Sequence, residues 1–217
     1  MSQLEMFSND RVIPANDPEM VSQVSGLRFL ENYVSQAEHD QILASIDREP
    51  WLDDLKRRVQ HYGFKYNYKS RSIDHGMYIG QLPDWSSTLC RHLLADQLIS
   101  YLPDQIIVNE YLPGQGIANH IDCEPCFNDT IISLSLISTC VMDVINKENP
   151  TKRLELLLPA RSLVVLSGEA RYRWTHGIAG RRVDEFNGIK IVRERRISLT
   201  FRKVIINDRD ELNCAIN

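Results

Sequence analysis

The heptapeptide Arg196-Ile-Ser-Leu-Thr-Phe-Arg202, close to the C-terminus, decides the fold class. Its apolar residues alternate with polar ones, and successive side chains of a strand point to opposite faces of a sheet. We therefore predict a strand whose Ile, Leu and Phe side chains pack on a core. Its polar face is either exposed to water or lines a cavity.

Other short β-type runs precede this strand. They are separated by Gly, Pro, Asn and Asp, and they lie at 105–112, 130–138, 140–145, 154–158, 162–166, 172–176 and 189–203. Seven or eight strands in about 100 residues are typical of a sandwich or jelly roll rather than of a parallel sheet with crossover helices. We therefore predict a mainly β fold with flanking helices.

The N-terminal half predicts two helices. Ser35-Gln-Ala-Glu38 is a capping box, which predicts a helix that continues to about Arg48. A second helix begins at Pro83-Asp-Trp85 and ends before Pro103, and both helices are expected to cover one face of the β structure. Residues 51–82, rich in Tyr, Lys, Arg and Gly, predict irregular hairpins.

These patterns predict one domain over residues 1–217. We expect the helices and a substrate lid in 1–100, the jelly-roll core in 101–205 and a tail in 206–217. Hydrophobic residues make up 43% and charged residues 25% of the 217 positions, which excludes wholesale disorder.

Composition also bears on location and cysteine chemistry. The chain has no apolar run of about 18 residues and no secretory signal, so we expect a cytoplasmic or nuclear monomer with no membrane partner. Five cysteines indicate reduced thiols. Cys123 and Cys126 form a C-x-x-C motif without the second pair that a zinc site needs, so unpaired loop cysteines are expected.

Charge is unevenly distributed. The net charge is −4, yet residues 171–203 hold ten Lys and Arg against three Asp and Glu. This cluster indicates either a local site for a polyanion or a pair of solvated strands.

The motif His120-Ile-Asp122 is the first candidate for chemistry. In an extended segment, residues two apart point to the same side, so this imidazole and carboxylate converge. With His176 they would form the facial triad of non-haem Fe(II) oxygenases. The alternative is a pair of hydrogen-bonded histidines near a surface loop.

Arg196 and Arg202 lie on the polar face of the last strand, about 20 Å apart at 3.3 Å per residue. Because the guanidinium fork binds carboxylates in a bidentate manner, this face could hold a dicarboxylate. Asn109-Glu-Tyr111 places an amide and a phenol on one face of another strand, as neutral donors to the same pocket.

Taken in order, four motifs resemble one family. Asn109-x-Tyr111, His120-x-Asp122, Ser167-Gly-Glu-Ala-Arg171 with His176-Gly177, and Arg196-x5-Arg202 are together similar to the AlkB family of Fe(II)- and 2-oxoglutarate-dependent dioxygenases. The resemblance covers about residues 60–203. It is closest to the branch that contains the tRNA wobble-uridine hydroxylases.

The resemblance implies a double-stranded β-helix, or jelly roll, and a role for each motif residue. His120, Asp122 and His176 would bind Fe(II). Arg196 would pair with the distal carboxylate of 2-oxoglutarate. The other end of this cosubstrate would contact Arg202, Asn109 and Tyr111, and Ser198 faces the same site. The residues implied for substrate are Tyr66, Tyr68, Lys69, Arg71, Glu124 and Arg153.

The family also implies the reaction. With O2 as the second cosubstrate, an alkylated nucleobase in DNA or RNA would be demethylated, releasing succinate, CO2 and formaldehyde. The alternative is hydroxylation of a modified wobble uridine in tRNA. A more distant alternative is a non-catalytic jelly-roll module that only binds a metal or a carboxylate.

Overall fold

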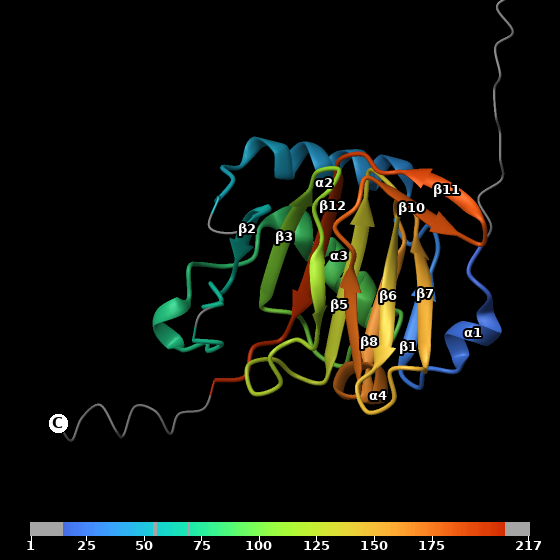
Figure 1. Ribbon diagram of the computed structural model, residues 1–217. Helices are drawn as coiled ribbons and strands as arrows, with labels where there is room; N and C mark the ends of the chain where they lie inside the picture. The colour runs from blue at the N-terminus through green and yellow to red at the C-terminus, as the bar shows by residue number, and fades with distance from the viewer. Residues whose placement is uncertain (1–14, 54–55, 69, 207–217) are drawn as a thin grey trace, which may run out of the picture.

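The computed structural model describes residues 15–53, 56–68 and 70–206. Two antiparallel sheets dominate it (Figure 1). The larger sheet has the order β1 (Leu27–Leu30), β8 (Leu163–Ser167), β5 (Thr130–Leu136), β12 (Arg196–Arg202), β3 (Gln105–Tyr111) and β2 (Arg58–Tyr62). The smaller sheet has the order β4 (Ile117–His120), β9 (Trp174–Ile178), β6 (Cys140–Asn146) and β7 (Arg153–Leu158). The mainly β jelly-roll prediction is confirmed.

Helices occupy the N-terminal half and one crossing between the sheets. They are α1 (Pro18–Ser22), α2 (Gln36–Arg48), the 3-10 turn η1 (His75–Met77), α3 (Asp84–Ala95) and α4 (Gly168–Tyr172). The predicted capping box is present, because the Ser35 side chain accepts from the Glu38 backbone N–H and the Glu38 side chain accepts from the Ser35 N–H.

The two longer helices cover one face of the larger sheet, as predicted (Figure 1). Ile46 of α2 and Leu93 of α3 are fully buried and belong to one core cluster with Leu199 and Phe201 of β12. The predicted alternation along β12 is therefore confirmed, because its odd-numbered apolar residues face the helices.

A second core cluster fills the space between the two sheets. Ile131 of β5 and Leu166 of β8 contribute from the larger sheet, and Val144 of β6 and Leu156 of β7 contribute from the smaller one. The even-numbered residues of β12 point to this inner side, where the cavity described below opens. Because side chains alternate along β12, its odd-numbered residues belong to the core that faces the helices, and its even-numbered residues form part of the cavity wall.

Several strand predictions need correction. The run 189–203 is two strands, β11 (Ile189–Val192) and β12, and β11 pairs with β10 (Val183–Phe186). The strand expected at 172–176 is β9, which begins only after α4. The short strands β1, β4 and β10 were not predicted, because four residues carry too little alternation to be recognised.

The hairpin β10–β11 covers the outer face of the smaller sheet, where Phe186 and Ile191 pack on Val141 and Leu157. Within the described ranges, no helix has the length and apolar character needed to cross a bilayer.

Candidate active site

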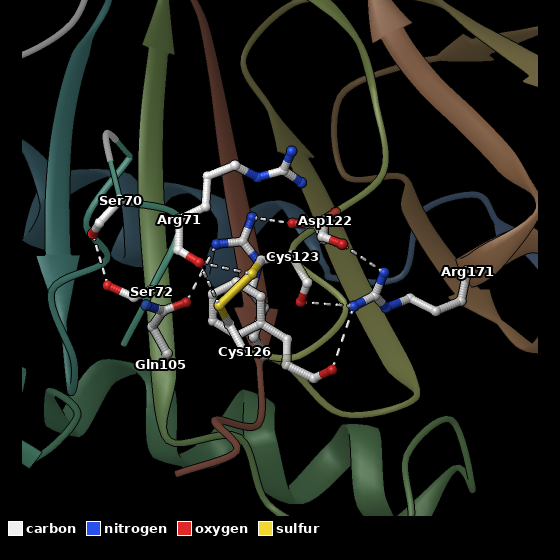
Figure 2. Close-up of a disulfide and its surroundings, with 10 residues drawn as sticks. Ser70, Arg71, Ser72, Gln105, Asp122, Cys123, Cys126 and Arg171 are labelled. Atoms are coloured by element: carbon white, nitrogen blue, oxygen red, sulfur yellow. Dashed lines mark hydrogen bonds and ion pairs between the residues drawn. A yellow bond between two sulfur atoms is a disulfide. The ribbon is translucent and has the colours of Figure 1, made fainter. Parts of the chain in front are cut away.

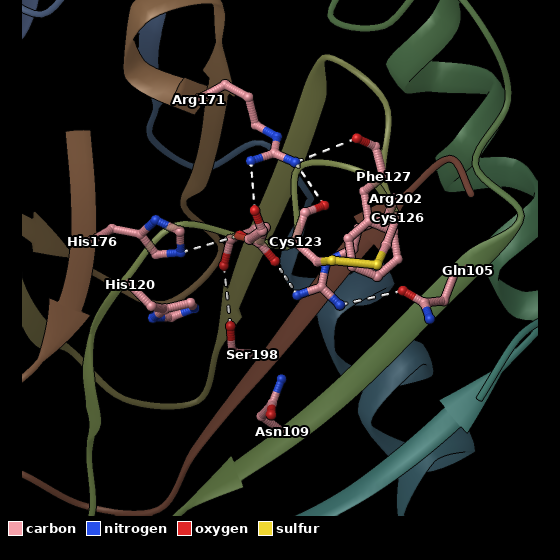
Figure 3. A network of polar contacts seen from close by, with 12 residues as sticks. Gln105, Asn109, His120, Cys123, Cys126, Phe127, Arg171, His176, Ser198 and Arg202 are labelled. Atoms are coloured by element: carbon pink, nitrogen blue, oxygen red, sulfur yellow. Dashed lines mark hydrogen bonds and ion pairs between the residues drawn. A yellow bond between two sulfur atoms is a disulfide. The ribbon is translucent and has the colours of Figure 1, made fainter. Parts of the chain in front are cut away.

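The pairing of β4 with β9 brings together the residues that the sequence separates by more than 50 positions. His120 lies directly opposite His176 in this antiparallel ladder, and Asp122 follows β4 by two residues. One ligand atom of each residue lies within 4.8 Å of the other two. Figure 3 shows the rings of His120 and His176 next to each other. These three side chains could therefore hold one metal ion.

Gly177 makes this close pairing possible. A Cβ atom at this position would lie 2.1 Å from the Asn119 side-chain oxygen and 2.8 Å from the Asn119 backbone nitrogen. Both distances are too short for any real contact, so only glycine lets β4 approach β9 beside His176.

Hydrogen bonding and charge prepare the three side chains for a cation. The Nδ1–H of His120 donates to the Ala118 carbonyl at 2.8 Å, which leaves its Nε2 available as a ligand. Burial alone would raise the pKa of Asp122, but the facing Arg202 and the two histidines hold it well below its usual value. Burial lowers the pKa of His176 to about 4, so its ring is neutral at pH 7.

Arg171 organises the backbone that carries Asp122. Its side chain is only 2% exposed, and its guanidinium donates to the carbonyls of Asp122 (2.9 Å), Cys123 (3.3 Å) and Phe127 (3.3 Å) (Figure 3). These bonds tie α4 to the loop that follows β4. The motif around Arg171 was noticed in the sequence, but this positioning role was missed, because its acceptors are backbone atoms about 45 residues away.

The two arginines of β12 reach the same cavity in different ways. Arg202 pairs with Asp122 and donates to Gln105, whereas Arg196 donates to Ser135 at 2.8 Å. Among the described residues, Nε and Nη1 of Arg196 and Nε of Arg202 have no hydrogen-bond partner although they are buried. Buried donors of this kind call for an acceptor, and a bound carboxylate would supply it.

Arg57 is a further cavity residue that the sequence did not indicate. Its Nε donates to Oδ1 of Asn109 at 2.8 Å, and its guanidinium lies 5.5 Å from the ring centre of Tyr111. Because Oδ1 is occupied in this way, the amide nitrogen of Asn109 is directed to the cavity (Figure 3). Arg196 lies 5.6 Å from the same tyrosine ring.

One cavity of about 780 Å³ contains all of these groups. Most of the predicted site residues line it: Asn109, Tyr111, His120, Asp122, His176, Arg196, Ser198, Arg202, Tyr66, Tyr68, Arg71 and Glu124. Lys147, at the end of β6, also lines the cavity and was not predicted.

Two predicted substrate residues are not brought to the cavity. Lys69 lies outside the described residues. Arg153 is exposed on the edge strand β7, where it pairs with Asp143 and Glu155 and does not line the cavity. β7 lies two strands away from β9 in the smaller sheet, so Arg153 stays a predicted substrate contact that lies outside the cavity.

The basic segment 171–203 is neutralised in part, by acids from other parts of the chain and by Asp184 within the segment. Arg195 pairs with Asp47 of α2 and with Glu110 of β3, and Lys203 pairs with Asp104. Arg193 pairs with Asp184 inside the segment. Part of this charge therefore serves the fold.

The expectation of unpaired loop cysteines is wrong for Cys123 and Cys126. The structure joins them in a disulfide, with their Cα atoms 5.3 Å apart, a separation usual for such a bond (Figure 2). The backbone turn explains the pairing, since the N–H groups of Cys126 and Phe127 both donate to the Cys123 carbonyl. Cys90 and Cys140 are free and buried.

The fold and the cluster define a class of protein. A jelly roll with a His–Asp–His triad, and with arginines that keep some buried nitrogens free of partners among the described residues, has the site of an Fe(II)- and 2-oxoglutarate-dependent oxygenase. In agreement, the sequence model of the 2OG-Fe(II) oxygenase superfamily matches residues 26–202. The solved structure titled "The structure of OsALKBH1" superposes with a TM-score of 0.63 at 15% identity, covering 82% of this chain and 98% of that one.

Named relatives of similar sequence indicate the family within this superfamily to which the chain belongs. Mouse "tRNA (carboxymethyluridine(34)-5-O)-methyltransferase ALKBH8" is 39% identical over 88% of this chain, but the match covers only 32% of the mouse protein. Arabidopsis thaliana "Alkylated DNA repair protein ALKBH8 homolog" is 34% identical over 88% of this chain and 62% of its own length. This chain belongs to the 2OG-Fe(II) oxygenase superfamily and, within it, to the AlkB family near the ALKBH8 branch. It is a dioxygenase that uses Fe(II), 2-oxoglutarate and O2.

Proposed function

We propose that this dioxygenase oxidatively demethylates an alkylated nucleobase in DNA or RNA. One observation carries the proposal: the cavity with the His–Asp–His cluster is also lined by Tyr66, Tyr68 and Arg71. Aromatic side chains can stack on an unpaired base, at about 1–3 kcal/mol per base, and cations can bind phosphates. A base reaches such a recessed cluster only when it is flipped or single-stranded.

We assign the metal to His120, Asp122 and His176. Neutral imidazoles and an ionised carboxylate are the donor set that Fe(II) prefers, and three ligands leave adjacent positions for cosubstrates. The bound iron, with 2-oxoglutarate and O2, supplies the oxidant for one C–H bond. The protein's own contribution is to keep the three ligands convergent, which the Ala118 carbonyl does for His120 and Arg171 does for the Asp122 backbone.

We assign 2-oxoglutarate to the β12 side of the cavity. Arg196 would receive the distal carboxylate, because two of its buried nitrogens lack a partner among the described residues. Arg202, Asn109 and Tyr111 would contact the end nearer the metal, and Ser198, bonded to Ser133 at 3.1 Å, would line the wall between them.

Glu124 supports an alkylated base as the substrate. It is exposed and lines the cavity two residues after Asp122. Methylation of a ring nitrogen can leave a base cationic, and an exposed carboxylate beside the cluster would attract such a base. Glu124→Gln should therefore raise KM for a cationic methylated base more than for a neutral one.

A modified wobble uridine in tRNA is the second candidate. The name of the mouse relative, a tRNA methyltransferase acting on carboxymethyluridine 34, favours tRNA as the polymer. A base that carries a carboxylate would find cations in this cavity, since Arg57, Arg71 and Lys147 line it.

Mass spectrometry of nucleosides separates the candidates. The protein, with Fe(II), 2-oxoglutarate and O2, is incubated with methylated single-stranded DNA, methylated duplex DNA and total tRNA. Loss of a methyl group with formaldehyde release supports demethylation. Gain of one oxygen on a tRNA nucleoside, without demethylation of any substrate, refutes the first candidate and supports the second.

Succinate formation tests the enzyme assignment itself. Asp122→Ala should abolish O2-dependent succinate formation, and unchanged turnover would refute the metal assignment. A module that only binds a carboxylate would form no succinate in the wild type either.

A further inference from the structure

The Cys123–Cys126 pair lies beside the active cluster but has no part in the proposed reaction. Both residues are buried, at 5% and 3% exposure, and Cys123 follows Asp122 directly. Cys123 also lines the cavity, so a small molecule that enters the cavity can approach this member of the pair.

Both sulfur atoms contact one backbone atom of the cavity wall. The carbonyl oxygen of Arg71 lies 3.3 Å from Sγ of Cys123 and 3.3 Å from Sγ of Cys126 (Figure 2). Arg71 has a φ of +52°, in the left-handed region that a non-glycine residue adopts only at a cost in free energy. In this disulfide-bonded structure the two sulfurs carry no hydrogen, so both are close van der Waals contacts with the Arg71 oxygen rather than hydrogen bonds.

The oxidation state of the pair changes what this carbonyl can bind. Each thiol carries an S–H group and can donate a weak hydrogen bond, whereas the sulfurs of a disulfide carry no hydrogen. The reduced pair therefore offers two donors to the Arg71 oxygen, and the oxidised pair offers none.

We propose that Cys123 and Cys126 form a redox-active site for thiol–disulfide exchange with low-molecular-weight disulfides, and that the redox state of this site controls how firmly Arg71 docks on the cavity wall. In the oxidising direction, two protein thiols react with one glutathione disulfide. The protein S–S bond forms, the glutathione S–S bond breaks, and two protons and two electrons pass to two molecules of glutathione.

The redox state of Cys123 and Cys126 would therefore change access to the substrate side of the cavity. Arg71 lines the cavity beside Tyr66 and Tyr68, so a firmly docked Arg71 completes the wall that we assign to the nucleobase. This consequence rests on the proposed function, whereas the redox chemistry and the docking of Arg71 do not.

Thiol counting tests the redox chemistry. The protein is equilibrated with glutathione disulfide or with dithiothreitol, then denatured in an excess of alkylating agent and weighed by mass spectrometry. Of the five cysteines, three should be alkylated in the oxidised sample and five in the reduced sample. Five alkyl groups in both samples would overturn the proposal.

Limited trypsin digestion tests the docking. Cleavage after Arg71 should be roughly threefold faster or more in the oxidised protein than in the reduced protein, because about two weak hydrogen bonds are lost. Cleavage after the exposed Arg182 serves as the internal control and should not change. Equal rates after Arg71 in the two states would overturn the coupling.

Two double variants separate hydrogen bonding from other effects of oxidation. The C123S/C126S protein keeps two O–H donors and should be cleaved slowly in both buffers. The C123A/C126A protein has no donors and should be cleaved fast in both. Cys90→Ala, a buried cysteine in the other core cluster, should retain the redox response of the wild type. A redox response that persists in C123A/C126A would also overturn the proposal.

These readouts need no nucleic acid. If the protein responds to redox state but demethylates nothing, the inference stands and the proposed substrate fails. If the protein demethylates a nucleic acid with the same KM, and trypsin cleaves after Arg71 at the same rate, in the oxidising and the reducing buffer, the redox inference fails while the proposed function stands.

Discussion

Replacing Arg171 by methionine is the sharpest test of how this fold supports its three metal-binding side chains. Methionine keeps most of the apolar volume but removes a guanidinium that donates to the carbonyls of Asp122, Cys123 and Phe127. These carbonyls lie under a side chain that is 2% exposed, so water cannot readily replace the lost donor.

The expected cost follows from those bonds. The variant would leave the Asp122 and Phe127 carbonyls without this donor, whereas the Cys123 carbonyl would still accept from two backbone N–H groups. An unsatisfied buried polar group costs about 1–3 kcal/mol. Because part of the loop can relax toward solvent, we expect the free energy of unfolding to fall by about 3–5 kcal/mol in total. The backbone of Asp122 should also become less ordered, so affinity for Fe(II) should fall as well, by about tenfold or more.

Arg173→Met is the matched control. Arg173 lies just after the same helix, but its ion pair with Glu169 spans 3.8 Å between side chains that are both more than half exposed. Such a pair contributes little, so the control should lose less than about 0.5 kcal/mol. Urea unfolding gives both free energies, and anaerobic calorimetry gives Fe(II) affinity. If Arg171→Met costs no more than Arg173→Met, the assigned role of Arg171 is refuted.

Three further predictions address the pairing of strands, the cosubstrate and acid stability. Gly177→Ala should force β4 away from β9 and weaken Fe(II) binding, measured by calorimetry, at least tenfold. Gly76→Ala is the control, because its Cβ would meet only a side-chain oxygen at 3.2 Å, and it should leave Fe(II) affinity unchanged. Arg57→Ala should raise the KM for 2-oxoglutarate about tenfold in a succinate-formation assay, because the Asn109 amide loses the charge-assisted bond that orients it. The same increase in Lys56→Ala would contradict this reasoning. The carboxyl of Glu110 has a pKa that burial would raise but that two paired arginines hold below its usual 4.5, so it contributes stability above pH 4.5 that is lost as the pH falls through the lowered value. Unfolding curves should therefore show a steeper loss of stability below pH 4.5 in the wild type than in Glu110→Gln, and parallel losses would refute this.

Local patterns were sufficient wherever one segment decides its own structure. The capping box at Ser35 begins α2, and the alternation in β12 places Leu199 and Arg196 on opposite faces of the strand. Both follow from hydrogen bonds or side-chain directions that a few consecutive residues establish.

Long-range contacts were not predictable in this way. The partners of the basic segment, Asp47, Glu110 and Asp104, come from α2, β3 and the loop before β3, so a count along the chain overestimated its free charge. The position of Arg153 on the edge strand of the smaller sheet, away from the cavity, was likewise set by strand order.

By itself, then, the sequence predicted the mainly β class and the two covering helices, and its resemblance to the AlkB family implied His120, Asp122 and His176 as the metal-binding residues. Only the tertiary structure decided that His120 faces His176 across β4 and β9, that Arg171 supports the Asp122 loop, and that Cys123 and Cys126 contact the wall at Arg71. The physical reason is that periodicity and capping act over a few residues, whereas register and loop closure depend on atoms that the chain brings together only when it folds.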